Sequence, residues 1–209
     1  MRKLTRVSLE KFLAANASDA EVLDIGSGGS GYGRYFPNRI TLDVDPARNP
    51  QVIGDAHELP FEDGRFAVIL CTEVLEHLSN PPKAISEMHR VLAPGGKLIL
   101  STRFLYPLHD VPHDYYRYTE FGLRHLFREW KEVTILPEAS TFRTLGILLQ
   151  RIILQTEVRG GKVTKALLLA LAYLCTRLDW LTKAEYGDIG RTRKVHEILS
   201  SGYYVTARK

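Results

Sequence analysis

Residues 22–28 read V-L-D-I-G-S-G and constrain the fold of this chain more than any other stretch. Apolar residues alternate around Asp24 and lead directly into glycine, which is typical of a β-strand followed by a tight turn. Glycine adopts positive φ and lets a ligand approach the backbone closely. We expect Asp24 to add a fixed negative charge at the mouth of the pocket, where it would suit a cationic amine better than a bare pyrophosphate.

Residues 26–31 also satisfy G-x-G-x-x-G, the fingerprint of dinucleotide-binding proteins. The match alone is unspecific, because glycines at a strand-to-helix turn can serve structure only. Few residues, interrupted by Pro37, separate Gly31 from the next apolar run, so the helix after the turn must be very short. A short helix weakens the argument for a phosphate site at a helix N-terminus.

Strand-like runs alternate with helical ones, and most of the strand-like runs are nearly continuously apolar, as in parallel strands covered on both faces. A clear helix starts at Pro81 and Pro82 and is stopped by Pro94-Gly95-Gly96. The alternation predicts an α/β fold with a doubly wound, mostly parallel sheet and a helical insertion before the last strand. The predicted strands are Glu21–Ile25, Arg39–Val44, Gln51–Gly54, Arg65–Cys71, Lys97–Thr102, Glu132–Leu136 and Gly202–Ala207.

The chain has 209 residues, of which 44% are hydrophobic and 25% charged, enough for one well-buried domain with an elaboration. We divide it into a core of residues 1–144, an apolar insertion of residues 145–200, and a last strand of the core at 201–209. The net charge of +4 is mild and scattered, so nucleic-acid binding is not indicated. Cys71 and Cys175 are expected to be reduced. No signal-peptide core follows the basic N-terminus, which favours a cytoplasmic protein.

Ligands of open α/β sheets lie beyond the carboxyl ends of the strands, so the residues that follow each strand should form the site. Asp43 follows the second strand, where a carboxylate can accept both hydroxyl hydrogens of a ribose. Asp55 follows the third strand, where an acid and backbone groups could hold an adenine. The stretch from Cys71 to His77 follows the fourth. Each acid taken singly could belong to an ordinary turn, but their joint order along the strand ends argues against this.

With these motifs the chain resembles the class I S-adenosylmethionine-dependent methyltransferases, in particular those acting on small molecules. The resemblance extends from Val22 to about Thr102, and it implies a Rossmann-like sheet of seven strands whose last strand is antiparallel. The matching stretches are V-L-D-I-G-S-G, T-L-D-V-D-P, G-D-A-H-E-L-P-F, F-A-V-I-L-C-T-E-V-L-E-H-L and R-V-L-A-P-G-G-K-L-I-L-S-T.

The resemblance also implies S-adenosylmethionine as cofactor, and it assigns residues to the parts of that molecule. Asp24 with Gly26, Ser27 and Gly28 would hold the methionine part. Asp43, with Val44 beside it, would bind the ribose. Asp55 and Ala56 would hold the adenine, and Cys71 and Thr72 would lie on the sulfonium side. An acid such as Asp24 fits beside an ammonium and a sulfonium, whereas a nicotinamide dinucleotide would offer a pyrophosphate there.

Methyl transfer requires a base only when the acceptor is a hydroxyl or a protonated amine. The candidates lie in the loop of residues 106–118, which follows the fifth strand and is rich in His, Asp, Tyr and Arg. Histidine titrates near neutral pH, so His113 or His109 could serve as base. The alternative is that both residues simply fasten the loop.

Glu73, Glu76 and His77 have the spacing of one helix face. Some methyltransferases, among them quinone O-methyltransferases and small-RNA 3′-end methyltransferases, bind a divalent metal through a similar E-x-x-E-H stretch. The same letters also occur in family members without a metal, and a fourth ligand would have to come from His109 or His113. We therefore predict no metal and leave this alternative open.

The insertion carries two apolar runs, Leu145–Leu154 and Ala166–Cys175, both shorter than a membrane span. We expect a mostly helical cap over the acceptor side; a homodimer face and a peripheral membrane contact are the alternatives. The chain as a whole is predicted to methylate a small acceptor, lipophilic or glycan-linked, with no DNA partner. A metal-dependent RNA 3′-end methyltransferase and a non-catalytic, cofactor-binding regulatory subunit are the competing hypotheses.

Overall fold

The computed structural model describes residues 3–29 and 31–209 and divides into two compact units. The sheet unit comprises Lys11–Arg103, His109–Leu136 and Tyr203–Lys209. The helical unit comprises the start of the chain up to Glu10, together with Phe104–Leu108 and Pro137–Gly202.

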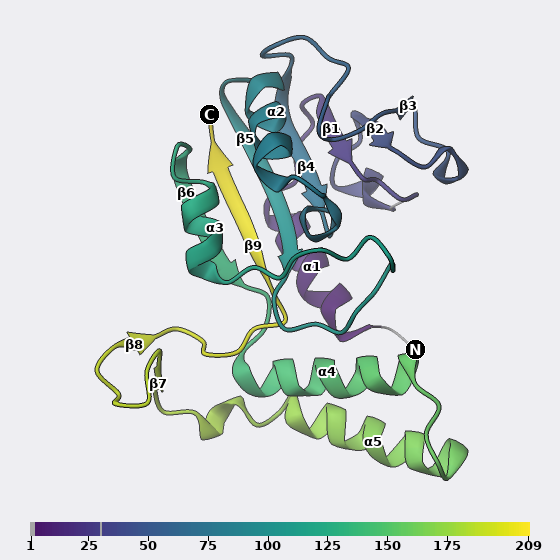
Figure 1. Ribbon diagram of the computed structural model, residues 1–209, viewed down its shortest axis with the longest axis vertical. Helices are drawn as coiled ribbons and strands as arrows, with labels where there is room; N and C mark the ends of the chain where they lie inside the picture. The colour runs from purple at the N-terminus through teal and green to yellow at the C-terminus, as the bar shows by residue number, and fades with distance from the viewer. Residues whose placement is uncertain (1–2, 30) are drawn as a thin grey trace. The chain divides into compact units, whose positions relative to one another are not determined.

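The sheet unit is built on a seven-stranded sheet in the order β3-β2-β1-β4-β5-β9-β6. Strands β3, β2, β1, β4 and β5 pair in parallel, whereas the arrow of β9 runs opposite to that of β5 (Figure 1). The mostly parallel sheet that the sequence predicts is confirmed. The strands are β1 Val22–Ile25, β2 Arg39–Asp43, β3 Val52–Ile53, β4 Phe66–Thr72, β5 Leu92–Arg103, β6 Lys131–Pro137 and β9 Gly202–Arg208.

The central strands are buried because their apolar side chains alternate to both faces of the sheet. Leu23 of β1, Ile69 and Leu70 of β4, and Ile99 of β5 are fully buried. The remaining regular elements of this unit are helices: α1 Leu4–Ala15, which starts in the helical unit, α2 Pro81–Val91, α3 Glu120–Leu126 and the short 3-10 helices η1 Tyr32–Arg34, η2 Pro46–Arg48 and η3 Leu75–His77.

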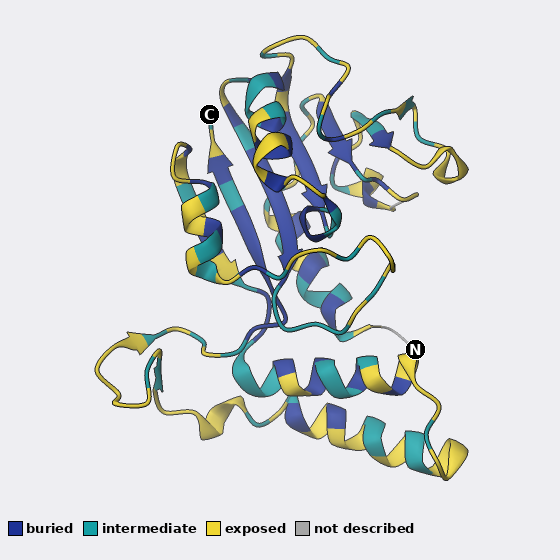
Figure 2. Ribbon diagram, viewed as in Figure 1, coloured by how far each residue is buried: buried dark blue, intermediate teal, exposed yellow. Residues whose placement is uncertain are grey.

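Helix α2 shows how local sequence sets an element. The Asn80 side chain accepts a hydrogen bond from the backbone N–H of Lys83, and prolines occupy the first turn, where a missing N–H costs nothing. Its buried residues recur at helical spacing and include Ala84 and Met88, while Figure 2 shows exposed residues along its outer side. The short η1 likewise confirms that only a brief helical turn follows the glycines.

Strand β5 is the element whose start differs most from expectation. It begins at Leu92 rather than at Lys97, and it passes through Pro94, Gly95 and Gly96 as a bulge in which Gly95 has a φ of 75°. The register against β4 shifts between Phe66 and Val68, which accommodates the extra residues. The helix α2 therefore ends before the proline and glycines as predicted, but β5 begins before them rather than after them.

The helical unit contains α4 Thr141–Gln155 and α5 Gly161–Cys175, which pack as a hairpin, followed by η4 Asp179–Leu181. Gly146 allows the two helices to approach, since a Cβ there would lie 2.5 Å from the carbonyl oxygen of Ala172. A separate two-stranded sheet, β7 Glu185–Tyr186 and β8 Lys194–Val195, follows. The insertion is helical as predicted and begins slightly earlier; its place over an acceptor stays a prediction.

Two further expectations can be checked on the described residues. Cys71 and Cys175 are both buried and free, as predicted. Within residues 3–29 and 31–209, neither α5 nor any other helix has the length and apolar character needed to cross a membrane.

Candidate functional site

The turn after β1 is built from glycines in the left-handed region, where side chains cause strain. Gly26, Gly28 and Gly29 have φ values of 63°, 52° and 71°. A Cβ on Gly26 would also lie 2.3 Å from Cγ2 of Val74. The backbone N–H of Gly26 donates to the carbonyl oxygen of Leu42 at 2.8 Å, so the turn is tied to β2. Gly26 is therefore required both for its conformation and for space.

Asp43 ends β2 and fixes this glycine turn from the other side. Its Oδ2 accepts a hydrogen bond from the backbone N–H of Gly28, and its Oδ1 accepts one from that of Asp45, both at 3.0 Å. A carboxylate offers about four acceptor positions, so about two remain for a ligand. Asp43 is only 8% exposed and lines the cavity, so a hydrogen-bond donor reaches the remaining acceptor positions only by entering the cavity.

Asp55 and His57 form a coupled pair after β3. His57 Nε2 accepts a hydrogen bond from the backbone N–H of Asn80 at 3.1 Å, so in the neutral ring the proton lies on Nδ1. Nδ1 lies 2.6 Å from Asp55 Oδ1 and donates to it. Partial burial would raise the pKa of Asp55, but the hydrogen bonds from His57 and the charge of Lys83 hold that pKa below its ordinary value. Asp55 therefore stays an acceptor at neutral pH.

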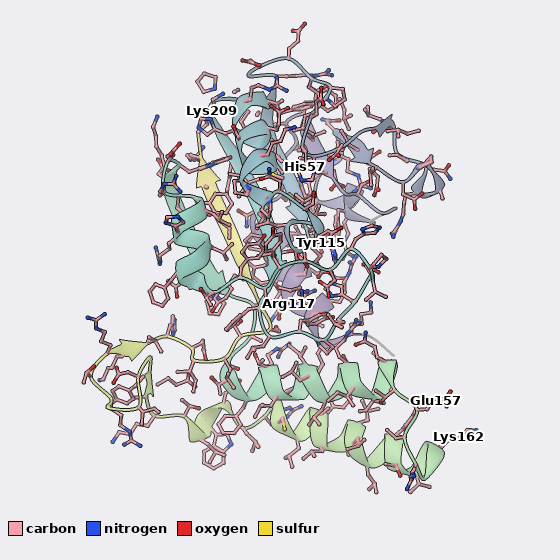
Figure 3. All side chains as sticks on the ribbon, in the orientation of Figure 1. His57, Tyr115, Arg117, Glu157, Lys162 and Lys209 are labelled. Atoms are coloured by element: carbon pink, nitrogen blue, oxygen red, sulfur yellow. The ribbon has the colours of Figure 1, made fainter. Side chains whose placement is uncertain are left out.

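A cavity of about 680 Å³ lies at these strand ends, within the size range of small-molecule sites. It lies wholly in the sheet unit, and two of its lining residues, His57 and Tyr115, are labelled in Figure 3. Predicted site residues that line it are Gly26, Gly28, Asp43, Val44, Asp55, Ala56 and His113. Lining residues to which the sequence analysis assigned no role are Ile25, Leu42, Asp45, Arg48, Gly54, His57, Val74, Leu78, Ser79, Asp110, Val111 and Tyr115.

Four residues predicted to bind a cofactor do not line this cavity. Ser27, Cys71 and Thr72 are buried beside it, and burial raises the pKa of the Cys71 thiol well above its usual range. Asp24 is fully buried, and its Oδ2 lies 2.9 Å from Nη1 of Arg39. The expectation that Asp24 exposes a charge at the pocket mouth is therefore wrong, because β1 is covered and Arg39 neutralises the carboxylate. Its contact with a cofactor stays a prediction.

The two candidate bases lie in different surroundings. His113 is exposed and lines the cavity, and its Nδ1 lies 3.0 Å from the hydroxyl of Tyr115. His109 does not line the cavity; its ring lies 3.8 Å from Glu76 and 3.5 Å from Asp114. The geometry therefore favours His113 as the group that meets a ligand, and His109 as part of the loop's support.

Ion pairs fasten the rest of this loop. Both oxygens of Asp114 accept hydrogen bonds from the guanidinium of Arg117, at 2.6 and 2.7 Å. These bonds are the main reason that the pKa of Asp114 falls to about 2. His77 Nδ1 donates to the carbonyl oxygen of His113 at 2.6 Å. The backbone that carries His113 is thus held on both sides.

Glu76, His77 and His109 offer ligand atoms that all lie within 4.8 Å of one another. Glu76 is fully buried, and its Oε2 accepts a hydrogen bond from the Thr102 hydroxyl. Burial alone would raise the pKa of Glu76, but the neighbouring His109 ring and the charge of Arg103 lower it. Because Arg103 already supplies a positive charge beside Glu76, we assign no metal to the cluster.

The expectation that Glu73, Glu76 and His77 share one helix face is wrong. Only Leu75–His77 is helical, as a 3-10 turn, and Glu73 precedes it with a φ of 57°. Glu73 instead pairs with the buried Arg103. A residue in the left-handed conformation interrupts the helical period, so the side chain of Glu73 does not share a helix face with Glu76 and His77.

Comparisons with known proteins match this architecture. A family model described as a methyltransferase domain matches residues 23–100. A probable chloroplastic tocopherol O-methyltransferase of Oryza sativa is 33% identical over 115 residues, covering 43% of this chain and 32% of that protein. A demethylmenaquinone methyltransferase of Paenarthrobacter aurescens is 35% identical over 104 residues, covering 48% and 40%. The chain thus spans two fifths or less of the lengths of these relatives.

A solved structure agrees over nearly the whole chain. It is a S-adenosylmethionine-dependent methyltransferase of Thermotoga maritima, described as a possible histamine N-methyltransferase, with a TM-score of 0.58. It is 15% identical, and the match covers 99% of this chain and 91% of that one. At this identity the likeness shows the fold alone.

Proposed function

We propose, on the premise that this chain belongs to the class I S-adenosylmethionine-dependent methyltransferases, that it transfers a methyl group to a lipophilic small-molecule acceptor. The observation that carries the proposal is the single cavity that joins the glycine turn and the strand-end carboxylates to the loop carrying Val111, His113 and Tyr115. One side is polar and suited to a nucleoside, while the other offers an exposed apolar side chain, an aromatic ring and an imidazole.

The residues present fit S-adenosylmethionine. Gly28 has no Cβ, so the cofactor can approach its backbone closely. A Cβ at this position would lie 3.1 Å from Nη1 of Arg48. Asp43 accepts the ribose hydroxyl hydrogens with the acceptor positions left by Gly28 and Asp45. Asp55, which His57 keeps anionic, accepts a hydrogen bond from the adenine amino group. When bound, the cofactor supplies a methyl carbon activated by its positively charged sulfur.

His113 is the group that takes the proton of an acceptor hydroxyl. When Nδ1 donates to the oxygen of Tyr115, Nε2 is the basic nitrogen. The bond from His77 to the His113 carbonyl holds the backbone in place, which limits the motion of the ring. Positioning accounts for much of the rate in such an in-line displacement, and the proton transfer adds to it.

The acceptor class is proposed from two sources. The names of the relatives given above include tocopherol and demethylmenaquinone, both lipophilic molecules with a ring that carries oxygen. The loop side of the cavity exposes Val111 and Tyr115, at 69% and 48% of their surfaces, which would contact such a ring. A glycan-linked acceptor stays an alternative with no comparable support on this face.

The test is methyl transfer from labelled S-adenosylmethionine to two acceptor panels, one of lipophilic phenols and quinols and one of glycans. Calorimetry with S-adenosylmethionine, its demethylated product and NADH, on the same preparation, measures cofactor binding separately. Turnover with the lipophilic panel supports the proposal. Turnover with glycans alone refutes the acceptor class, binding without turnover on any acceptor supports the non-catalytic hypothesis, and binding of NADH alone refutes the cofactor.

A further inference from the structure

One face of α5 is apolar and exposed. Val163, Leu167, Leu171 and Leu174 are 70%, 68%, 45% and 54% exposed, and their spacing of four, four and three residues places them on one side of the helix. Ala166 and Ala170, which are also exposed, lie between them. The opposite side, with Ala172 and Cys175, is buried. Figure 2 shows the many exposed residues along α5.

Two more exposed apolar side chains follow the end of α5. In η4, Trp180 is 78% exposed and Leu181 is 51% exposed. Exposed apolar surface of this extent usually marks an interaction site. A tryptophan beside leucines is typical of segments that lie at the boundary between water and lipid, because the indole is both apolar and polar. We name the set Val163, Ala166, Leu167, Ala170, Leu171, Leu174, Trp180 and Leu181 the α5 face.

Positive charge surrounds the α5 face. Residues 141–200 contain ten basic and five acidic residues, a formal +5, whereas the whole chain is +4, so the remainder is −1. Exposed basic residues lie before α5 at Arg159, in its first turn at Lys162, and after it at Arg177 and Lys183. Lys162 is labelled at one end of the hairpin in Figure 3. Among the described residues, none of these four forms an ion pair with an acid.

We propose that the α5 face docks the protein on an anionic lipid surface. A fifteen-residue helix that is too short to span a bilayer can lie in the interface, with apolar side chains inserted and basic side chains toward the headgroups. A second copy of this chain is a poorer occupant, because two copies of residues 141–200, each carrying +5, repel one another. The proposal does not depend on the methyl acceptor, and its test requires no activity.

The experiment measures binding of the full chain to vesicles of phosphatidylcholine alone and of phosphatidylcholine with about 30% phosphatidylglycerol. Sedimentation of the vesicles gives the partition coefficient, and Trp180 gives a second readout, since Trp130, the other tryptophan, is buried. We expect binding to the anionic vesicles, with a blue shift of tryptophan emission, and its loss in high salt. Equal or absent binding to both vesicles overturns the proposal.

Two variants separate the apolar and the charged contributions. Leu167→Glu should reduce binding to the anionic vesicles at least about tenfold, and Lys162→Glu should reduce it about fivefold or more. The matched control is Phe121→Glu, on α3 of the sheet unit, because Phe121 is also 70% exposed. Unchanged binding in Leu167→Glu, with retained circular dichroism, refutes the α5 face. A chain that is dimeric without lipid and becomes monomeric in Leu167→Glu assigns the face to a second copy instead.

Discussion

The sheet unit and the helical unit both contain long apolar runs, but only the sheet unit buries such runs on both faces of the element. Strand residues such as Leu70 and Ile99 are fully buried between helix-covered faces, whereas Leu167 of α5 is 68% exposed. A central strand presents two faces that neighbouring elements cover, while a helix in a two-helix hairpin has one covered face and one open face. An apolar run therefore predicts a core only when its element is covered on all sides. The exposed run is better explained by a partner surface.

If the sheet unit carries the reaction and the helical unit the lipid contact, the largest effect of a substitution is expected at His113 of the sheet unit. His113→Ala should reduce turnover about 100- to 10,000-fold, because a general base contributes that much, while cofactor affinity stays unchanged. Steady-state kinetics and calorimetry measure the two quantities. Vesicle binding should not change either, since His113 belongs to the sheet unit.

The control for that variant is His109→Ala, which alters the support of the loop. It should reduce turnover less than His113→Ala and lower the melting temperature, because the His109 ring lies between Glu76 and Asp114. If both variants turn over at the wild-type rate, the loop contributes positioning at most and the assignment of a base fails.

The next effect is on cofactor affinity. Asp43→Ala should weaken binding of S-adenosylmethionine by about 2–4 kcal/mol, or about 30- to 1,000-fold, since charge-assisted hydrogen bonds are lost. Calorimetry measures it, and the neighbouring Asp45→Ala is the control, because that half-exposed carboxylate caps η2 instead. Equal losses in both variants would mean that general negative charge, rather than Asp43, holds the ligand.

A smaller effect is expected from separating the helices of the hairpin. Gly146→Val should destabilise the helical unit by about 1–3 kcal/mol, because a side chain there meets the Ala172 carbonyl. Denaturant unfolding followed by circular dichroism measures this, with the exposed Ala170→Val as control. Cofactor affinity should be retained. A matching loss of cofactor affinity would contradict the assignment of cofactor binding to the sheet unit alone.

The smallest effect is expected on removing metal. Turnover and stability should be unchanged after dialysis against a chelator, because Arg103 already provides positive charge beside Glu73 and Glu76. Turnover that is lost on chelation and restored by one divalent cation would instead support a metal at Glu76, His77 and His109. Activity on RNA under those conditions would favour the competing RNA hypothesis.

The local sequence determined the strands, α2 and the position of the site at the strand ends. Alternating or continuous apolar runs set Val22–Ile25 and Phe66–Thr72, and Asn80 with its prolines set the start of α2. Asp43 and Asp55 were found because parallel strands bring their carboxyl ends to one edge. These features depend on periodicity and on capping, which neighbouring residues carry.

Only the tertiary structure decided which of those side chains face the cavity. Arg39 approaches Asp24 across the β1–β2 pair and neutralises it, and a left-handed Glu73 turns to Arg103 rather than along a helix. His57 joins Asp55 and Asn80 across 23 residues of sequence. The exposure of the α5 face likewise depends on which helix packs on which side. Such outcomes arise from long-range pairing and burial, and no local pattern in the chain encodes them.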